Sequence, residues 1–296
     1  MLGEALASVR AQTYQPLEVL VVDDGSTDGS ADLAEASGVR VVRLGTNRGN
    51  SVAYNVGTQL AAGEAIAWLD SDDYWEPGHL ATVASLLEAN PSAAAASAAA
   101  RLVGTRSGTW YGRIPEGPPS DVLRAAFHDW LTPTITTIVR RDALLEVGGF
   151  DESERFATDF DIWLRLARRY PFVATREITA NWRWHGSQHS TDPTRQWRAT
   201  YRFRARLLRE VRGDGEVALA EDLSEIFRRK WEEDIQAAWD DGRREWLREL
   251  LGMAPMVPSV PSSSKLRWML RAAIPPRAVT LLRTAKQRLS RTPAGA

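Results

Sequence analysis

The sequence predicts an α/β fold in which a mostly parallel sheet is covered by helices on both faces. Two observations lead to this prediction. First, apolar runs such as residues 17–22 and 39–44 alternate with short helical patterns, and this alternation indicates right-handed crossovers between parallel strands. Second, the runs at 17–22 and 65–69 are apolar almost throughout rather than at alternate residues, which is typical of strands that are buried on both faces.

Each expected element follows from its local pattern. Leu2, Leu6 and Val9 lie on one face of a helix, and residues 26–30 carry the turn and capping residues that start another. Residues 93–100 are ambiguous, because alanine favours a helix while the turn that follows favours a hairpin of strands. The expected order is helix 2–10, strand 17–22, helix 31–36, strand 39–44, helix 52–61, strand 65–69, helix 77–87, loop 112–120, strand 134–139, and helices 142–146, 158–169, 194–212 and 216–251.

Composition limits the domain organisation and the chemistry. The 296 residues are 44% apolar, carry a formal net charge of −1 and include no cysteine, which excludes disulfides, thiolate nucleophiles and Cys-ligated zinc. We expect no membrane-spanning helix and no signal peptide, and therefore a cytoplasmic protein. The expected organisation is a main domain at 1–195, a helical extension at 196–252, a linker rich in proline and serine at 253–264, and a basic tail at 265–296.

The tail combines eight Lys or Arg residues with leucines and holds no acid. A basic amphipathic segment predicts a peripheral contact with the inner face of a membrane. The alternative is a solvated tail that packs loosely on its own domain. Aromatic residues are sparse in this segment, so we expect no nucleic acid as a partner.

Acidic clusters follow two of the predicted strands. Asp23 and Asp24 follow the first strand, and the third strand ends before Asp70, Asp72 and Asp73. Ligands bind outside the carboxyl ends of strands in such sheets, so we expect the clusters to share a pocket. On an extended segment, Asp70 and Asp72 point to one side and form half of a site for a hard divalent cation. The alternative is a solvated acidic turn that caps the next helix.

Four motifs in register resemble family 2 glycosyltransferases over roughly residues 1–190. Residues 21–28 read VVDDGSTD and residues 47–57 read NRGNSVAYNVG, which is similar to the nucleotide-sugar half of that family. The LDSDD at 69–73 looks like the family's D-x-D motif, and residues 147–166 look like its acceptor half.

This resemblance implies a GT-A fold, with a Rossmann-like mixed sheet, helices on both faces and here a helical C-terminal extension. It implies Mg²⁺ or Mn²⁺ as cofactor and an inverting transfer of a sugar to an acceptor hydroxyl. The implied partners are a nucleotide-diphosphate sugar donor and a saccharide or lipid-linked acceptor, in cell-surface polysaccharide or glycolipid synthesis.

The resemblance also implies roles for single residues. Asp159 matches the general base, although Thr158 stands where the family usually has Glu. Asp72 matches the direct ligand of the cation, and Asp70 supports it. His185, which follows an aromatic–Arg pair, matches a ligand of the cation or the diphosphate. The implied donor-binding residues are Asp24, Asp23, Asn47, Gly49, Asn55, Asp70 and His185.

Structural alternatives stay open for these residues. Asp24 also fits a turn carboxylate, and His185 also fits a structural histidine. Thr158 and Asp161 fit a capping box, in which Asp159 would only favour the helix N-terminus. Asp73 is expected to cap or to orient the loop, whatever role its neighbours have.

The front of the chain departs from the family pattern. The family begins with a central strand that contributes to the nucleotide pocket, whereas this chain starts at the helix that follows that strand. Either the start of the chain was assigned too late, or a truncation removed a central strand, in which case the pocket loses part of its wall. Two other function classes stay open, namely a truncated, inactive domain for nucleotide-sugar binding or interaction, and a nucleotidyltransferase. The second also uses carboxylates and a cation, but the Gly-rich loop that would hold a triphosphate is missing.

Overall fold

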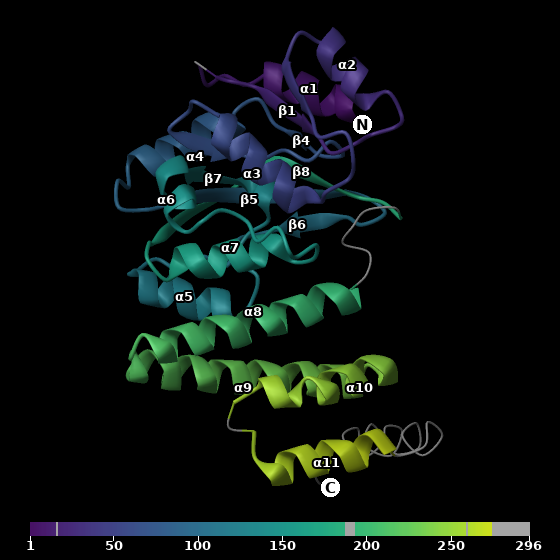
Figure 1. Cartoon of the computed structure of the whole chain (residues 1–296), viewed down its shortest axis with the longest axis vertical. Helices are drawn as coiled ribbons and strands as arrows, with labels where there is room; N and C mark the ends of the chain where they lie inside the picture. Colours follow the sequence, from purple (N-terminus) through teal and green to yellow (C-terminus); the bar gives the residue numbers. More distant parts are fainter. Residues whose placement is uncertain (16, 187–192, 259, 274–296) are drawn as a thin grey trace, which may run out of the picture. The chain divides into compact units, whose positions relative to one another are not determined.

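The computed structural model describes residues 1–15, 17–186, 193–258 and 260–273, and the chain divides into two compact units after Gly215 (Figure 1). The first unit is α/β and the second is helical. The strands of the first unit are β1 (Leu20–Asp23), β2 (Arg40–Arg43), β3 (Ala65–Ala67), β4 (Tyr74–Trp75), β5 (Ala95–Gly104), β6 (Gly108–Trp110), β7 (Thr137–Arg140) and β8 (Phe172–Trp184). Its helices are α1 (Leu2–Arg10), α2 (Ser30–Ala36), α3 (Asn50–Leu60), α4 (His79–Glu88), α5 (Pro119–His128), the 3-10 turn η1 (Thr134–Thr136), α6 (Arg141–Glu146), α7 (Thr158–Ala167) and α8 (Pro193–Gly213).

The first unit contains two sheets in its described residues. β1 and β2 form a parallel pair, and the other strands form a mixed sheet of order β3-β7-β5-β8-β4, with β6 added to β5. Among the described strands of the mixed sheet, only β5 and β8 are parallel. The prediction of a mostly parallel sheet is therefore wrong for this part, because β6 returns on β5 through a tight turn and β7 runs antiparallel to both of its neighbours.

The alanine run with an ambiguous prediction is the central strand β5. All residues from Ala95 to Ala100 are buried, because α4 packs against one face and α5 and α7 lie on the other (Figure 1). Alanine side chains on this strand let α4 approach it closely. Tertiary burial thus outweighs the helix propensity of alanine.

Three elements of the first unit have no counterpart in the sequence prediction. β4 is only two residues long, and α5 starts at Pro119 inside the predicted loop, where proline is well suited to the first turn of a helix. β8 mixes buried and exposed residues without strict alternation. The predicted domain boundary at 195 falls within α8, which packs on α7 and belongs to the first unit.

The second unit contains α9 (Val217–Asp240), α10 (Arg244–Gly252), the turn η3 (Ala254–Met256) and α11 (Ser262–Ala273). One helix was expected where α9 and α10 stand, but Gly242 adopts a left-handed φ of 72° and ends α9. The indole of Trp231 donates to the Leu250 carbonyl at 2.7 Å and ties the two helices together. The predicted linker contains η3 and the start of α11, and the predicted tail beyond 273 lies outside the described residues. No helix in the described ranges combines the length and apolar character needed to cross a membrane.

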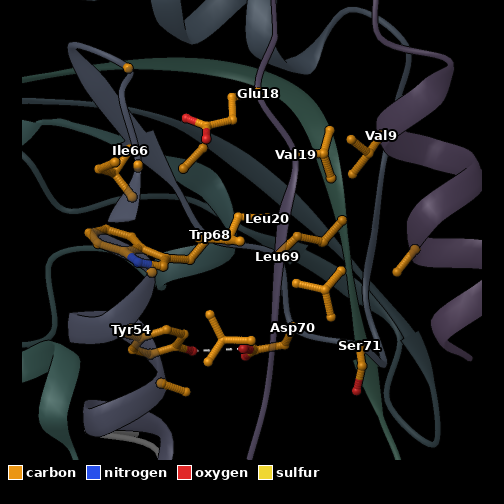
Figure 2. A pocket seen from close by; sticks show the side chains of 18 of the residues that line it. Val9, Glu18, Val19, Leu20, Tyr54, Ile66, Trp68, Leu69, Asp70 and Ser71 are labelled. Carbon is orange, nitrogen blue, oxygen red and sulfur yellow. Dashed lines mark hydrogen bonds between the residues drawn. The ribbon is translucent and has the colours of Figure 1, made fainter. Parts of the chain in front are cut away.

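A cavity of about 840 Å³ separates β1 from β3 (Figure 2). It is lined by one face of α1, by both strands and by α3. The cavity is partly open to the surface, so it is not an empty void inside a close-packed interior. It is a candidate binding space.

His79 makes the stability of the first unit depend on pH. Its side chain is 0% exposed, is stacked on Trp75 and has Nδ1 at 2.8 Å from Thr179 Oγ1. Burial lowers the pKa of His79 to about 3 from the ordinary 6.5. Below pH 6.5 the unfolded chain therefore binds a proton that the folded chain does not, and stability falls as the pH falls.

We expect this residue to remove about 2 kcal/mol from the free energy of unfolding between pH 7 and pH 5. Urea unfolding of the parent chain and of His79→Gln at both pH values measures the effect. The loss on acidification should be about 2 kcal/mol smaller in the variant, whatever its absolute stability. An equal loss in both proteins would show that His79 is not held neutral.

Candidate functional site

The loop after β1 forms the first part of the site. Gly25 has a φ of +79°, and a Cβ there would lie 2.7 Å from the backbone carbon of Thr46, so the close approach of these two loops requires glycine. Asp24 fastens the same turn, since its two oxygens accept the N–H groups of Arg48 and Gly49, each at 2.7 Å. At this end the cavity is lined by Asp23, Asp24, Ser26, Asn47 and Gly49.

Asn55, predicted to bind the donor, lies at a joint behind the cavity. It is 9% exposed, and its amide exchanges hydrogen bonds with the backbone of Phe150, at 2.8 Å from the N–H and 2.9 Å to the carbonyl. Its Nδ2 also donates to Glu152 at 3.0 Å. Asn55 therefore joins α3 to the turn at 148–152, which links the two motif-bearing halves of the unit.

The turn after β3 brings three carboxylates together. Ligand atoms of Asp70, Asp72 and Asp73 lie within 4.8 Å of one another. The prediction of an extended segment is wrong here. The Asp73 N–H donates to the Asp70 carbonyl at 3.1 Å and closes a turn. Asp73 is buried and accepts the backbone N–H of Arg183 at 2.6 Å, and burial raises the pKa of Asp73 to about 8. The position of Asp73 is that of a residue that orients the turn.

Asp70 and Asp72 face out of this turn and meet two further side chains. Asp72 Oδ2 lies 2.9 Å from Nε2 of His185, which follows β8. Asp70 Oδ1 accepts the phenol O–H of Tyr54 at 2.7 Å (Figure 2). Asp70 is exposed, but the protein around the cleft partly desolvates its carboxyl and raises its pKa, while the Tyr54 hydrogen bond opposes this effect.

The donor set of this turn fits a hard divalent cation. Mg²⁺ and Mn²⁺ prefer carboxylate oxygens and complete their shell with waters or phosphate oxygens. Asp70 and Asp72 each keep one carboxylate oxygen outside the hydrogen bonds with Tyr54 and His185. Like charges this close repel one another, and a bound cation would offset that cost.

Asp159 lies at the start of α7 and faces the same site. Its carboxyl interacts electrostatically with Asp70, and the Tyr54 hydroxyl is close enough to be affected by both. Asp159 Oδ2 accepts the indole N–H of Trp130 at 2.9 Å. Burial raises the pKa of Asp159 to about 7, so this carboxyl can gain or lose a proton near neutral pH.

The capping-box interpretation of Thr158 and Asp161 is wrong. Helix α7 begins after Ala157 without a side-chain cap, and the φ of Ala157, 53°, is positive, which is rare for a residue with a side chain. Asp161 is 2% exposed, and its carboxylate pairs with Arg165 at 2.7 Å and with Arg206. Asp161 thus serves packing, while Asp159 stays available to the site.

Two contacts in the candidate site, those of Tyr54 with Asp70 and of Trp130 with Asp159, were not predicted from the sequence. Tyr54 stands directly before Asn55 on α3, so its position in the NRGNSVAYNVG stretch was an available signal. Trp130 comes after α5, in a segment without a motif. It meets Asp159 only because α5 and α7 pack together.

Sequence comparison relates the chain to known glycosyltransferases. The family described as Glycosyl transferase family 2 matches residues 1–149. The glucosyl-dolichyl phosphate glucuronosyltransferase of Haloferax volcanii is 31% identical over 164 residues, which cover 50% of each chain. An uncharacterized glycosyltransferase of Bacillus subtilis is 29% identical over 180 residues, 57% of this chain and 64% of that one. The chain spans about half the length of the curated relatives it matches.

Solved structures give the fold. S. aureus TarS in complex with UDP-GlcNAc matches with a TM-score of 0.65 and 21% identity over 87% of this chain and 78% of that one. The mannosyltransferase PcManGT from Pyrobaculum calidifontis, in complex with GDP-Man and Mn²⁺, matches with a TM-score of 0.58 and 19% identity over 95% and 78%. The fold is therefore the predicted GT-A fold. Since the family match covers half of the 296 residues, the chain belongs to glycosyl transferase family 2.

Proposed function

We propose that the chain transfers a sugar from a nucleotide-diphosphate sugar to an acceptor hydroxyl with inversion at the anomeric carbon. One observation carries the proposal. A carboxyl with a pKa near 7, Asp159, lies close enough to the acidic turn of Asp70 and Asp72 to interact electrostatically with Asp70. An inverting transfer needs these two things together, a base for the acceptor proton and a place for the leaving diphosphate.

The residues divide this work between them. Asp23, Asp24, Asn47 and Gly49 line the nucleoside end of the cavity. Asp70, Asp72 and His185 would hold Mg²⁺ or Mn²⁺, which when bound supplies Lewis-acid stabilisation of the developing diphosphate charge.

The Asp159 carboxylate takes the proton from the acceptor hydroxyl while that oxygen attacks the anomeric carbon. The hydrogen bond from Trp130 holds the carboxylate in place for this step. A positioned base of this kind contributes roughly 10²–10⁴ in rate.

Nucleotide binding tests the proposal against the two other function classes. Thermal unfolding is followed with UDP, GDP, UTP and GTP, each with Mn²⁺ or with EDTA. Stabilisation by a diphosphate that needs the metal and exceeds that of its triphosphate supports the glycosyltransferase. Stronger stabilisation by triphosphates would indicate a nucleotidyltransferase. Stabilisation by none of the nucleotides would indicate an inactive domain. That alternative stays open because β1 and β3 are separated.

The acceptor is proposed to be a saccharide or a lipid-linked saccharide in cell-surface polysaccharide or glycolipid synthesis. The relative from Haloferax volcanii, named for a dolichyl phosphate substrate, supports a lipid-linked acceptor. An enzyme with such an acceptor would work at the cytoplasmic face of a membrane. Flotation with anionic liposomes, with and without residues 265–296, tests this location, and equal flotation would argue against the tail as an anchor.

In Tyr54→Phe, the Mn²⁺ concentration needed for half-maximal stabilisation by a nucleoside diphosphate is expected to rise about 10- to 100-fold. The Tyr54 hydroxyl orients Asp70, and partners that orient metal ligands typically contribute this much. The fold should persist, because the ring still packs on Trp68 and Phe150. The measurement is a Mn²⁺ titration at fixed UDP or GDP.

Tyr170→Phe provides the matched control for this titration. It removes a hydroxyl that bonds to Glu146 on the surface, so the same Mn²⁺ midpoint as in the parent chain is expected. A Tyr54→Phe midpoint equal to that of the control would remove Tyr54 from the site.

Turnover is expected to fall as the pH drops below about 7, by roughly tenfold per pH unit. The base acts only when deprotonated, and burial raises the pKa of Asp159 to about 7. A bound cation beside Asp70 would lower this value, so the midpoint should lie at or below pH 7. A pH–rate profile at saturating donor measures it, and turnover that is constant from pH 7 to pH 4 would contradict a carboxyl base.

A further inference from the structure

We propose that three tryptophans on one face of the mixed sheet bind the acceptor, and that this acceptor is a saccharide with an acidic group. The three residues, Trp110, Trp182 and Trp184, are here called the aromatic ladder. The inference rests on the proposed function, because it names the class of acceptor for the same reaction. It is carried by the register of the strands, by what lies at the two ends of the ladder, and by an arginine that covers one of its rings.

The register of three neighbouring strands places the ladder on one face. On β5, Ala100 pairs with Trp110 of β6, and two residues further on Leu102 pairs with Trp182 of β8. Since side chains alternate along a strand, residues 100 and 102 point to the same face, and so do their partners and Trp184. The ring centroids lie 6.5 Å apart for Trp110 and Trp182 and 5.3 Å apart for Trp182 and Trp184, so the rings form one continuous aromatic surface.

This surface is fixed from below and open above. Trp182 packs against the apolar core that includes Leu80 and Val83 of α4, while the side chains of all three tryptophans stay partly exposed. A sugar ring has faces made of C–H groups, which aromatic rings can cover while the hydroxyls stay free for hydrogen bonds. Sites for small ligands combine such aromatic surface with a few polar groups that fix the orientation. The aromatic ladder therefore suits a saccharide.

One end of the ladder lies at the acidic turn. Trp184 is the last residue of β8 and directly precedes His185. His185 Nε2 lies 2.9 Å from Asp72 Oδ2, in the turn that is proposed to hold the cation and the diphosphate. A saccharide on Trp184 is therefore next to the place where the donor sugar would be bound.

The other end lies at the segment that positions the proposed base. A Cβ on Gly112 would lie 3.9 Å from the Trp110 ring and 3.4 Å from the Leu131 carbonyl oxygen. Leu131 directly follows Trp130, whose indole donates to Asp159. An acceptor hydroxyl has to reach both the base and the donor sugar, and the ladder joins the two segments that carry their sites. It therefore lies where an acceptor is expected to bind.

The charge beside the ladder specifies an acidic group on the ligand. Residues 95–115 contain three arginines and no Asp or Glu. Two of them, Arg101 and Arg113, pair with carboxylates from other parts of the chain. The third, Arg106, forms no ion pair within the described residues, and its guanidinium carbon lies 3.8 Å from the centre of the Trp184 ring. An exposed cation is thus kept on the ladder without a carboxylate of its own.

Arg106 is able to move from the ring to a ligand. Stacking of an exposed guanidinium on an aromatic ring is a weak attraction, whereas a guanidinium binds a carboxylate or a phosphate through two charge-assisted hydrogen bonds. The same move uncovers Trp184, whose Nε1 is buried and has no hydrogen-bond acceptor among the described residues. An unsatisfied buried N–H is costly, and a hydroxyl of the saccharide would accept it. One acidic saccharide therefore satisfies both groups.

The test is fluorine NMR of the full chain labelled with fluorotryptophan. The ladder signals are assigned with Trp110→Phe, Trp182→Phe and Trp184→Phe, and the two outer rings suffice if Trp182→Phe does not fold. The probes are the tetrasaccharides of galacturonic acid and of glucuronic acid, together with their methyl esters. The esters keep the sugar rings and lose the charge, and no nucleotide is present.

At least one of the acids is expected to shift the ladder signals, with a half-saturation concentration about tenfold lower than that of its ester. Arg106→Gln should remove this preference and leave the binding of the ester unchanged. Arg267→Gln is the matched control, because Arg267 stacks on Trp268 in the second unit, and it should keep the preference of the parent chain.

Ladder signals that move with neither acid would overturn the proposal. Equal half-saturation by acid and ester would also overturn it, as would an acid preference that survives in Arg106→Gln. Shifts of the same size in the other tryptophan signals would show that the saccharide binds without selecting the ladder, which has the same consequence. Stabilisation by UDP or GDP with Mn²⁺ is measured on the same samples. A silent ladder in a chain that binds UDP or GDP would overturn this inference alone. Ladder binding without any response to nucleotides would contradict the proposed function and, with it, the role of the saccharide as acceptor.

Discussion

An Asp159→Asn variant is expected to turn over on the order of 10²–10⁴ times more slowly than the parent chain. Asparagine keeps the size of the side chain and an oxygen that can accept the Trp130 N–H, but it cannot take the acceptor proton. Donor binding should be nearly unchanged, because Asp159 acts on the acceptor side. Initial rates at saturating donor, together with the stabilisation by UDP or GDP with Mn²⁺, measure the two effects separately.

Asp161→Asn is the matched control, since it makes the same change two residues along the same helix. Asp161 pairs with Arg165 and Arg206 in a buried position, and the loss of one partner of a buried ion pair costs about 3–5 kcal/mol. Its effect should therefore appear in the free energy of unfolding, with turnover per folded molecule preserved. Near-full turnover in Asp159→Asn, or a loss of turnover in Asp161→Asn alone, would show that the base is assigned to the wrong carboxylate.

The sequence predicted where those candidate site residues lie whose position depends on local chain geometry. Asp24 and the acidic turn follow apolar strands, and such strand ends meet at one edge of the fold regardless of how the rest of the sheet is connected. For this reason the prediction held for their meeting place even though the sheet is mixed rather than mostly parallel. The turn geometry of residues 70–73 was not predictable from spacing alone, because it depends on the backbone hydrogen bond between Asp73 and Asp70.

Contacts made by tertiary packing were beyond the reach of sequence patterns. Trp130 reaches Asp159 because two helices pack together, and no periodicity marks that contact. Asn55 was expected at the donor but lies in the joint to Phe150, since a motif shows that a residue matters without showing which neighbour it serves. The alanine run of β5 was ambiguous for a related reason, because only the helices on its two faces decide between strand and helix.

An Asp72→Asn variant is expected to lose metal-dependent stabilisation by UDP or GDP and to turn over roughly 10²–10³ times more slowly. A cation that stabilises a developing diphosphate charge contributes several kcal/mol, and each 1.36 kcal/mol is about a tenfold change in rate. Asp72 faces out of the turn beside His185. The substitution replaces a charged carboxylate at this position by a neutral amide. Mn²⁺ titrations of stabilisation and of turnover measure the loss.

The adjacent carboxylate, Asp73, provides the matched control for this prediction. Asp73→Asn changes the same chemical group one residue away, but Asp73 is buried and holds the Arg183 N–H, a hydrogen bond that an asparagine oxygen can also accept. Asp73→Asn should therefore keep its metal dependence and lose less than about tenfold in turnover. If Asp73→Asn abolished the response to Mn²⁺ while Asp72→Asn kept it, the cation would be bound on the inner side of the turn. The outward pair Asp70 and Asp72 would then be the orienting residues, and the division of roles within the acidic turn would be reversed.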